Sequence, residues 1–290
     1  MEPTEALVEA GLEPASVLDL VDRAIAEDLD GGVDVTSVAT VSPEARGTLD
    51  LVARAAGVIA GAPVAAAALV RASEGRVTCT WIGDGTHVRP GDVVVSATGP
   101  TRDLLLGERT ALNLICHLSG VATATSRWVD ALGDSTTRVR DTRKTTPGMR
   151  RLEKYAVRCG GGVNHRMSLS DAALVKDNHV VAAGGVAAAF ARVREEFPGI
   201  AVEVEVDSLD QLDEVLDAGA DLVLLDNFTP DQMREAVRRT AGRAQLEASG
   251  GLTLADAPAV GATGVDFVAV GALTHSAPVL DIGADLREAQ

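Results

Sequence analysis

The second half of the chain is built on a repeat of about 20 residues, and this spacing restricts the fold more than any other feature. Apolar stretches centred from Val204 to Val268 alternate with amphipathic stretches typical of helices. Ser208, Thr229 and Thr253 stand at expected helix N-caps, and Pro230 suits a first helical position. Because strands and helices alternate along the chain, the sequence predicts a parallel sheet or an α/β barrel. The expected helices are 185–197, 208–218, 229–241 and 253–260.

Polar residues or glycines stand at the carboxyl ends of the expected strands in this half. The strands are expected at 137–142, 172–179, 201–208, 221–228, 244–251 and 266–273. The carboxyl ends of parallel strands carry the chemistry of both α/β barrels and open α/β sheets. A barrel is favoured because no strand leads into a G-x-G-x-x-G fingerprint. The residues expected at the strand ends are Arg143, Lys144, Lys176, Asp177, Asn178, Glu205, Asp207, Asp226, Asn227, Ser249, Gly250, Gly251 and Gly271.

Residues 1 to about 115 have a different pattern. A helix is expected at 15–29, followed by a loop at 30–37. Short β-rich runs separated by turn signals follow at 47–61, 76–83 and 86–99. These features predict a small sheet domain with one or two helices. A long helix at 107–131 is expected to lead into the repeat region.

Positive charge is concentrated in one segment of an acidic chain. The net charge is -16, yet the segment 138–166 holds nine Lys or Arg against two acidic residues. The overall charge argues against nucleic-acid or anionic-membrane binding, because most of the surface would repel phosphates. A basic run is most often a solvated face. Here the run contains Gly, Pro, Thr and Asn in place of helical repetition, so we predict an anion pocket formed with Lys176.

Cysteine usage and the N-terminal segment indicate the cell compartment. The three cysteines match no zinc spacing, and an odd number forms no closed set of disulfides. The first residues are acidic and lack the features of a secretory signal, and no apolar run is long enough to span a bilayer. We therefore expect a cytoplasmic protein with free thiols and no membrane partner.

The remaining polar residues narrow the ligand class. Glu205 and Asp226 lie one repeat apart and could hold Mg²⁺ or sugar hydroxyls, with structural ion pairing as the alternative. Glycines before helix starts at 249–251 and 271 suit a phosphate. His165 ranks below the Arg and Lys residues because a lone His is more often an ordinary hydrogen-bonded residue. Together these features predict a site for a phosphorylated sugar beside a small carboxylate.

Several strings closely resemble the quinolinate phosphoribosyltransferase family, also called nicotinate-nucleotide pyrophosphorylase (carboxylating). The matching strings, which cover almost the whole chain, are EDLDGGVDVTS, GERTALNLICHLSGVAT, DTRKTTPGMRRLEKYAVRCGGGVNHR, LVKDNH, VEVEVDS, LLDNF, EASGGL and VGALTHS. The resemblance implies that quinolinate and phosphoribosyl pyrophosphate give nicotinate mononucleotide, pyrophosphate and CO2, with Mg²⁺, in NAD biosynthesis. It also implies an N-terminal α/β sandwich domain (1–116 plus the tail 276–290) and an incomplete parallel α/β barrel (117–275).

The resemblance further implies roles for individual residues and for a second subunit. Quinolinate is expected to bind Arg143, His165, Arg166 and Lys176, with Arg109 supplied by the partner of a homodimer; a hexamer remains possible. Lys144 is expected to act in catalysis with Lys176, Glu205 and Asp226. The other expected substrate contacts, including those to the phosphoribosyl donor and its metal, are Thr142, Asn227, Ser249, Gly250, Gly251, Gly271 and His275.

Three alternative functions stay open at the level of sequence. Nicotinate phosphoribosyltransferase acts on a monoacid without decarboxylation, and the concentration of positive charge favours the diacid instead. A molybdenum-operon protein of related sequence is the second alternative. A sensor that binds phosphosugars without catalysis is the third, and release of CO2 would distinguish it from the enzyme.

Overall fold

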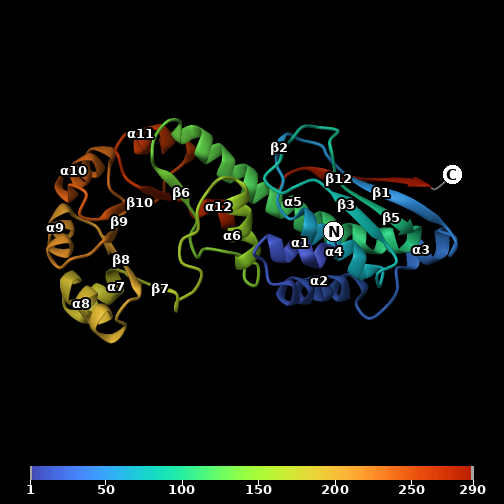
Figure 1. The fold of residues 1–290 in the computed structure, drawn as a ribbon, viewed down its shortest axis with the longest axis horizontal. Coiled ribbons are helices and arrows are strands. Elements are labelled where there is room, and N and C mark those ends of the chain that lie inside the picture. The colour runs from blue at the N-terminus through green and yellow to red at the C-terminus, as the bar shows by residue number, and fades with distance from the viewer. Residues whose placement is uncertain (1, 289–290) are drawn as a thin grey trace. The chain divides into compact units, whose positions relative to one another are not determined.

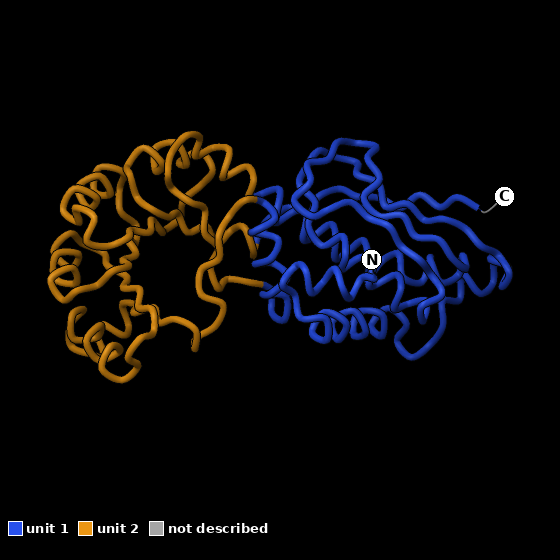
Figure 2. The backbone as a smooth tube through the Cα atoms, viewed as in Figure 1, with its two compact units in different colours: residues 1–124, 146–160, 276–290 blue, residues 125–145, 161–275 orange. Residues whose placement is uncertain are grey.

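The computed structural model describes residues 2–288, which divide into two compact units (Figure 2). Unit 1 consists of residues 1–124, 146–160 and 276–290, and unit 2 of residues 125–145 and 161–275. The segments 117–124 and 146–160 therefore belong to unit 1, whereas the sequence analysis had placed both in the barrel domain. The tail from residue 276 also belongs to unit 1. Among the described residues, no helix has both the length and the apolar character needed to cross a membrane.

Unit 1 is an antiparallel sheet covered by helices (Figure 1). Its sheet has the strand order β12-β1-β5-β3, and a separate two-stranded sheet pairs β2 with β4. The elements are α1 (Pro3–Glu9), α2 (Pro14–Leu29), α3 (Val35–Thr40), β1 (Arg46–Ala53), β2 (Gly57–Val58), α4 (Ala62–Ala72), β3 (Thr78–Trp81), β4 (His87–Val88), β5 (Val93–Pro100), the first part of α5 (Thr101–Leu132), α6 (Arg150–Cys159) and β12 (Ile282–Glu288).

Helix α4 forms the centre of unit 1. It contacts α1 and α2 as well as strands β3 and β5. Its residues from Ala62 to Leu69 are buried, and small side chains allow the neighbouring elements to approach closely. The two carboxylate oxygens of Asp84 accept hydrogen bonds from the backbone N–H groups of Gly61 and Ala62, at 2.8 and 3.0 Å. This carboxylate thereby satisfies donors that the first turn of a helix leaves unpaired.

Unit 2 is a parallel α/β barrel that does not close, and Figure 1 shows its helices outside the curved sheet. The six strands follow the order β6-β11-β10-β9-β8-β7, and every neighbouring pair is parallel. Besides the end of α5, the elements are β6 (Arg138–Arg140), β7 (Ala172–Val175), α7 (Asp177–Ala183), α8 (Val186–Glu196), β8 (Ala201–Val206), α9 (Leu209–Asp217), β9 (Leu222–Asp226), α10 (Pro230–Thr240), β10 (Gln245–Ser249), η1 (Leu254–Asp256), α11 (Ala257–Gly261), β11 (Phe267–Ala269) and α12 (Ala272–His275).

Local capping explains where the barrel helices begin. The Ser208 and Thr229 hydroxyls accept the backbone N–H groups three residues later, at 3.5 and 3.3 Å. Pro230 occupies the first turn of α10, where a missing N–H costs nothing. These two starts agree with the sequence analysis. Thr253 also stands at an N-cap, but it precedes the short 3₁₀ helix η1 and not a full α-helix.

Several sequence predictions of local structure were wrong. The small sheet domain was expected to have one or two helices, and unit 1 contains α1, α2, α3, α4 and α6 besides part of α5. The predicted loop 30–37 runs into helix α3, because Asp34 accepts the Ser37 N–H at 3.0 Å and starts a helix at Val35. The predicted strand 172–179 ends at Val175, and α7 begins at Asp177. In both places a short local capping interaction decided the structure.

Candidate active site

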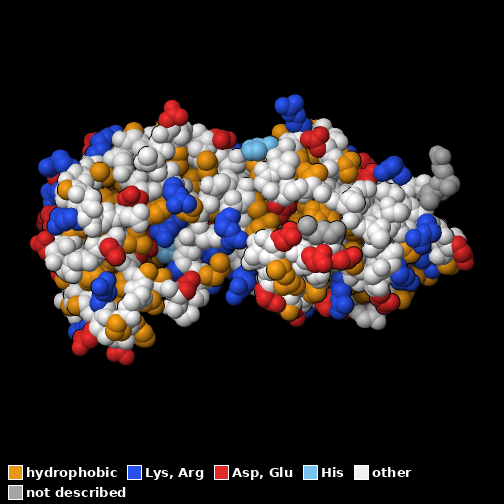
Figure 3. All heavy atoms as spheres, viewed as in Figure 1, with side chains coloured by type: hydrophobic (Ala, Val, Ile, Leu, Met, Phe, Trp, Pro, Cys, Tyr) orange, Lys and Arg blue, Asp and Glu red, His pale blue; other side chains and the backbone are white. Residues whose placement is uncertain are grey.

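A cavity of about 630 Å³ opens at the carboxyl ends of the unit 2 strands. All but two of the residues that the sequence analysis expected to bind substrate or act in catalysis line it. The exceptions are Arg109, which is exposed on α5 in unit 1, and Asn227, which lies beside the lining loop. Figure 3 shows Lys and Arg side chains around the middle of unit 2 on the face that is drawn. The lining residues are Thr142, Arg143, Lys144, His165, Arg166, Leu174, Lys176, Glu205, Leu224, Asp226, Glu247, Ser249, Gly250, Gly251, Leu252, Ala269, Val270, Gly271, Ala272 and His275.

Two guanidinium groups form a cationic wall of the cavity. Arg166 donates from Nη1 to the Ala172 carbonyl at 2.9 Å, which fixes its side chain. The Nε atoms of Arg143 and Arg166 are buried and have no hydrogen-bond partner among residues 2–288. Burial, together with the charge of Arg143, lowers the pKa of Arg166. Two half-buried guanidinium groups that repel one another and each keep a buried, unpartnered Nε atom are a site prepared for an anion, because an anion supplies both the missing acceptor and the missing charge.

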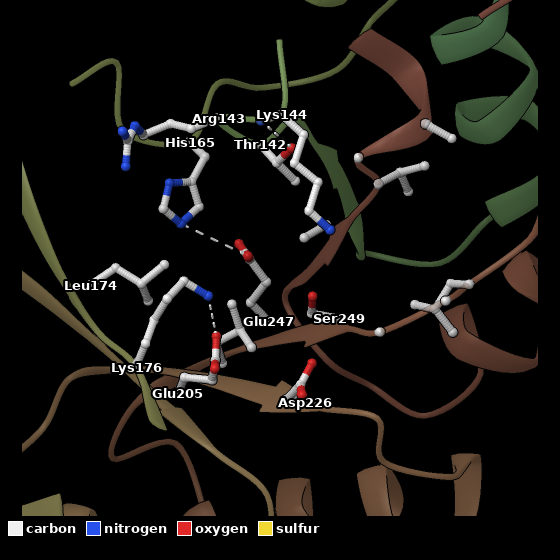
Figure 4. A pocket seen from close by; sticks show the side chains of 18 of the residues that line it. Thr142, Arg143, Lys144, His165, Leu174, Lys176, Glu205, Asp226, Glu247 and Ser249 are labelled. Atoms are coloured by element: carbon white, nitrogen blue, oxygen red, sulfur yellow. Dashed lines mark hydrogen bonds and ion pairs between the residues drawn. The ribbon is translucent and has the colours of Figure 1, made fainter. Parts of the chain in front are cut away.

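A lysine and two carboxylates occupy the ends of three adjacent strands. The Lys176 ammonium donates to the Glu205 carboxylate at 2.5 Å, as Figure 4 shows. Burial raises the pKa of Asp226, the charge of Glu205 raises it further, and Lys176 partly offsets both effects. The two carboxylates are therefore close enough to repel one another, and Lys176 balances only one negative charge. A further cation or several hydroxyl groups would be stabilised here.

Glycines leave room for a ligand beside the loop that follows β10. Gly250 has a φ of +106°, and a Cβ atom there would lie 2.3 Å from the Asn227 side-chain oxygen. Gly251 also has a positive φ, +58°, but a Cβ atom there would meet nothing within 4 Å. At Gly271 a Cβ atom would press against Lys144 and His275, at 3.1 and 3.4 Å. Backbone N–H groups in such glycine turns are accessible to a phosphate.

The barrel interior contains a charged layer that the sequence analysis missed. Arg140 donates to Glu247 at 2.7 Å and lies 3.8 Å from Glu203, while His165 contacts Glu203 through Nε2. Arg140, Glu247 and Glu203 come from β6, β10 and β8. These are every second strand of the sheet, as in the side-chain layers of a barrel. The sequence did contain a signal for this layer. Glu203 and Glu247 stand two residues before Glu205 and Ser249, and residues two apart in a strand point to the same face of the sheet.

The basic segment 138–166 does not act as one surface, so that part of the prediction was too broad. Of its nine basic residues, only Arg143, Lys144 and Arg166 line the cavity. Residues 150–159 form helix α6, although the sequence analysis saw no helical repetition in the run. Within α6, Glu153 is fully buried and accepts the His117 ring N–H and the Thr146 backbone N–H, at 2.9 and 3.0 Å. The remaining basic residues of α6 therefore belong to unit 1 and not to the cavity.

Two family models match the chain in adjoining segments. The model for the N-terminal domain of quinolinate phosphoribosyl transferase matches residues 34–119. The model for the C-terminal domain of quinolinate phosphoribosyl transferase matches residues 121–285. Together the two matches leave out only the first helices and the last residues.

Individual relatives agree over nearly their whole length. The nicotinate-nucleotide pyrophosphorylase (carboxylating) of Mycobacterium leprae is 50% identical over 273 residues, which is 92% of this chain and 96% of the relative. The enzyme of the same name from Homo sapiens is 39% identical, over 95% of this chain and 93% of the relative. The crystal structure of NadC from Streptococcus pyogenes superposes with a TM-score of 0.92 at 39% identity, covering 96% of this chain and 99% of that one.

Proposed function

The chain belongs to the quinolinate phosphoribosyl transferase family, and on this premise we propose that the cavity of unit 2 is its active site. The reaction transfers the phosphoribosyl group of phosphoribosyl pyrophosphate to quinolinate, and it yields nicotinate mononucleotide, pyrophosphate and CO2 in NAD biosynthesis. The placement rests on one observation, the convergence of two guanidinium groups with unpartnered Nε atoms, two lysines and a glycine loop on a single cavity.

Quinolinate carries two carboxylates, and the cationic wall supplies the matching charge. Arg143 and Arg166 are placed to grip one or both carboxylates, since their buried Nε atoms lack an acceptor. His165 and Lys176 extend this wall toward the strand ends, and Thr142 adds a hydroxyl beside it. A rigid wall of this kind holds the pyridine ring in one orientation, which is what attack by its nitrogen requires.

The phosphoribosyl donor fits the opposite side of the cavity. The glycine turn at 249–251 and the approach of Gly271 to Lys144 leave backbone N–H groups and one ammonium for phosphate oxygens. Glu205 and Asp226 face the ribose position, and Asn227 supports the turn through its contact with Gly250. His275 completes this side next to Gly271. Lys144 neutralises the pyrophosphate as it leaves.

The carboxylates at the ends of β8 and β9 fit a magnesium ion. Glu205 and Asp226 offer hard oxygen ligands, and burial together with the charge of Glu205 already raises the pKa of Asp226. Lys176 occupies one oxygen of Glu205, and the Asn227 amide donates to one oxygen of Asp226 at 2.7 Å. The remaining oxygens would hold the ion or its bound waters. When bound, Mg²⁺ supplies positive charge to the pyrophosphate leaving group.

The residues carry out the reaction by alignment and charge neutralisation. The ring nitrogen attacks C1 of the ribose as the bond to pyrophosphate breaks, and Lys144 stabilises the departing charge. The nitrogen is then quaternary, so the C2 carboxylate can leave as CO2 while its bonding electron pair stays on C2. Arg143 and Arg166 hold the carboxylates while this happens.

The assay that tests the proposal is release of CO2 from carboxyl-labelled quinolinate, with phosphoribosyl pyrophosphate and Mg²⁺ each omitted in turn. We expect release only when all three are present. Lys144→Ala and Lys176→Ala should lower turnover by about 100-fold or more, the size of effect seen when one charge-stabilising group is removed. Near-normal turnover in folded variants would contradict the assignment of this cavity.

We also propose that the enzyme is a cytoplasmic homodimer in which the partner's Arg109 reaches the cavity. Arg109 is exposed on α5 and does not line the cavity of its own chain. The three cysteines are free, which suits a reducing compartment. Inactive Arg109→Ala and inactive Lys144→Ala chains should regain activity when they are mixed and reassembled, because one site of each mixed dimer is intact. Absence of recovery, with mixed dimers demonstrated by mass spectrometry, would rule out the shared site.

A further inference from the structure

We propose that Glu247 is the acid that protonates C2 of the product ring after CO2 has left. Glu247 lies on β10 and its side chain is completely buried from bulk solvent, yet it lines the cavity. Decarboxylation leaves an electron pair on C2, and the product requires a hydrogen at that carbon. This inference rests on the proposed placement of the active site.

The two oxygens of the Glu247 carboxyl group differ in their hydrogen bonding. Its Oε2 atom accepts a hydrogen bond from Arg140 at 2.7 Å. Its Oε1 atom is buried and has no hydrogen-bond partner among residues 2–288, since His165 Nε2 is 3.9 Å away. A carboxylate oxygen buried without a donor is costly, whereas a hydroxyl group directed at a ligand is not.

The charges around Glu247 also favour the neutral form. The Arg166 backbone N–H donates to His165 Nδ1 at 2.7 Å, so this ring nitrogen acts as a hydrogen-bond acceptor. Arg140 is a cation of a layer that contains two carboxyl groups, Glu203 and Glu247. Glu203 forms a hydrogen bond with His165 Nε2, and its carboxyl group lies in the same layer as that of Glu247.

Burial is the main cause that raises the pKa of Glu247, to about 8, and repulsion from Glu203 and Asp141 adds to it. Arg140 opposes this shift without cancelling it. A raised pKa favours the protonated carboxyl group, which is the form that a general acid needs before it releases its proton.

The position of Glu247 suits the transfer of a proton to C2. Figure 4 shows its carboxyl group between His165, on the proposed quinolinate side, and Ser249, on the proposed donor side. The bond between the ring nitrogen and the ribose forms between these two sides, and C2 is adjacent to that nitrogen. The C2 electron pair takes the proton from Oε1, the O–H bond breaks, and Glu247 is left as the carboxylate. Solvent reprotonates it once product has left.

The test is the single-turnover rate of Glu247→Gln across the pH range, because glutamine keeps the shape and the Arg140 hydrogen bond but has no acidic proton. We expect the rate of nicotinate mononucleotide formation to fall by about 10²- to 10⁴-fold. The affinity for quinolinate, measured by calorimetry, should change little. The wild-type rate should decline as pH rises through the ionisation of Glu247, and the variant should lack this decline.

A wild-type rate and pH profile in Glu247→Gln would overturn the proposal and leave solvent as the proton source. If the variant does not fold, infrared spectroscopy of the wild type decides. A band from a protonated carboxylic acid at neutral pH that disappears above the ionisation of Glu247 supports the proposal, and absence of any such band contradicts it. Failure of the proposed active site would look different, since the wild type itself would then release no CO2.

Discussion

Gly250→Ala should damage the enzyme much more than Gly251→Ala, although the two glycines are neighbours in the same turn. Both have positive φ angles, so each substitution strains the backbone. The φ of +58° at Gly251 lies in the left-handed region, where a non-glycine residue costs about 1–2 kcal/mol, and the φ of +106° at Gly250 lies outside that region and costs at least as much. They differ in the space available. A Cβ atom at Gly250 would lie 2.3 Å from the Asn227 side-chain oxygen and 2.7 Å from its backbone nitrogen, whereas at Gly251 nothing lies within 4 Å.

The overlap at Gly250 sets the expected difference. Forcing extra atoms into occupied space costs about 1–3 kcal/mol, because the backbone or side chain must move. The free energy of unfolding should therefore be lower for Gly250→Ala than for Gly251→Ala by about that amount. If the strain is relieved by moving the turn, the affinity for phosphoribosyl pyrophosphate should fall instead, by about 5- to 150-fold.

Urea denaturation and calorimetric titration of both variants measure the two quantities. Gly251→Ala is the matched control, since it also places a side chain at a positive φ in the same turn but meets no overlap. Equal stability and equal donor affinity in the two variants would refute the reasoning from the Asn227 contact. A larger effect in Gly251→Ala would show that the turn does not have this geometry.

Three further outcomes follow from the charges and thiols of the two units. Lys176→Met should raise the pKa of Asp226 further. Part of the free energy of unfolding lost at pH 7 should be recovered as the pH falls through this raised pKa, because the folded state then binds a proton that the unfolded state still lacks, and the gain is complete below the ordinary carboxyl pKa of about 4. Arg287→Ala should cost about 1 kcal/mol in urea denaturation, because the mostly buried Asp50 loses its cation. Burial raises the pKa of Cys79 to about 12, so iodoacetamide at pH 8 should alkylate it far more slowly in native than in urea-unfolded protein, as followed by mass spectrometry.

Each of these has an outcome that would count against it. Unchanged pH dependence of unfolding in Lys176→Met would mean that Asp226 does not sense the ammonium. A loss under about 0.3 kcal/mol in Arg287→Ala would place that ion pair with ordinary surface pairs, which contribute about 0–1 kcal/mol. Equal alkylation rates in native and unfolded protein would show that Cys79 is accessible.

The sequence by itself determined the repeat and the chemistry at its strand ends. Alternation of period two in strands and capping residues such as Ser208 are local properties, so they can be read from neighbours in the chain. The resemblance of the motifs supplied the family, which the matches over 34–119 and 121–285 bear out. The positions of Lys176, Glu205 and Asp226 at the ends of expected strands were enough to place all three at one edge of the sheet.

Only the tertiary structure decided which charges meet. The basic run divides between the cavity and helix α6 because the chain leaves unit 2 at residue 145 and returns at 161. Glu247 resembles any glutamate in an alternating strand, and its burial against Arg140 and Glu203 depends on strands brought together by the curvature of the barrel. Burial and pairing arise from contacts between residues distant in sequence. The local sequence pattern does not encode these contacts, and it is these contacts that raise the pKa of Glu247.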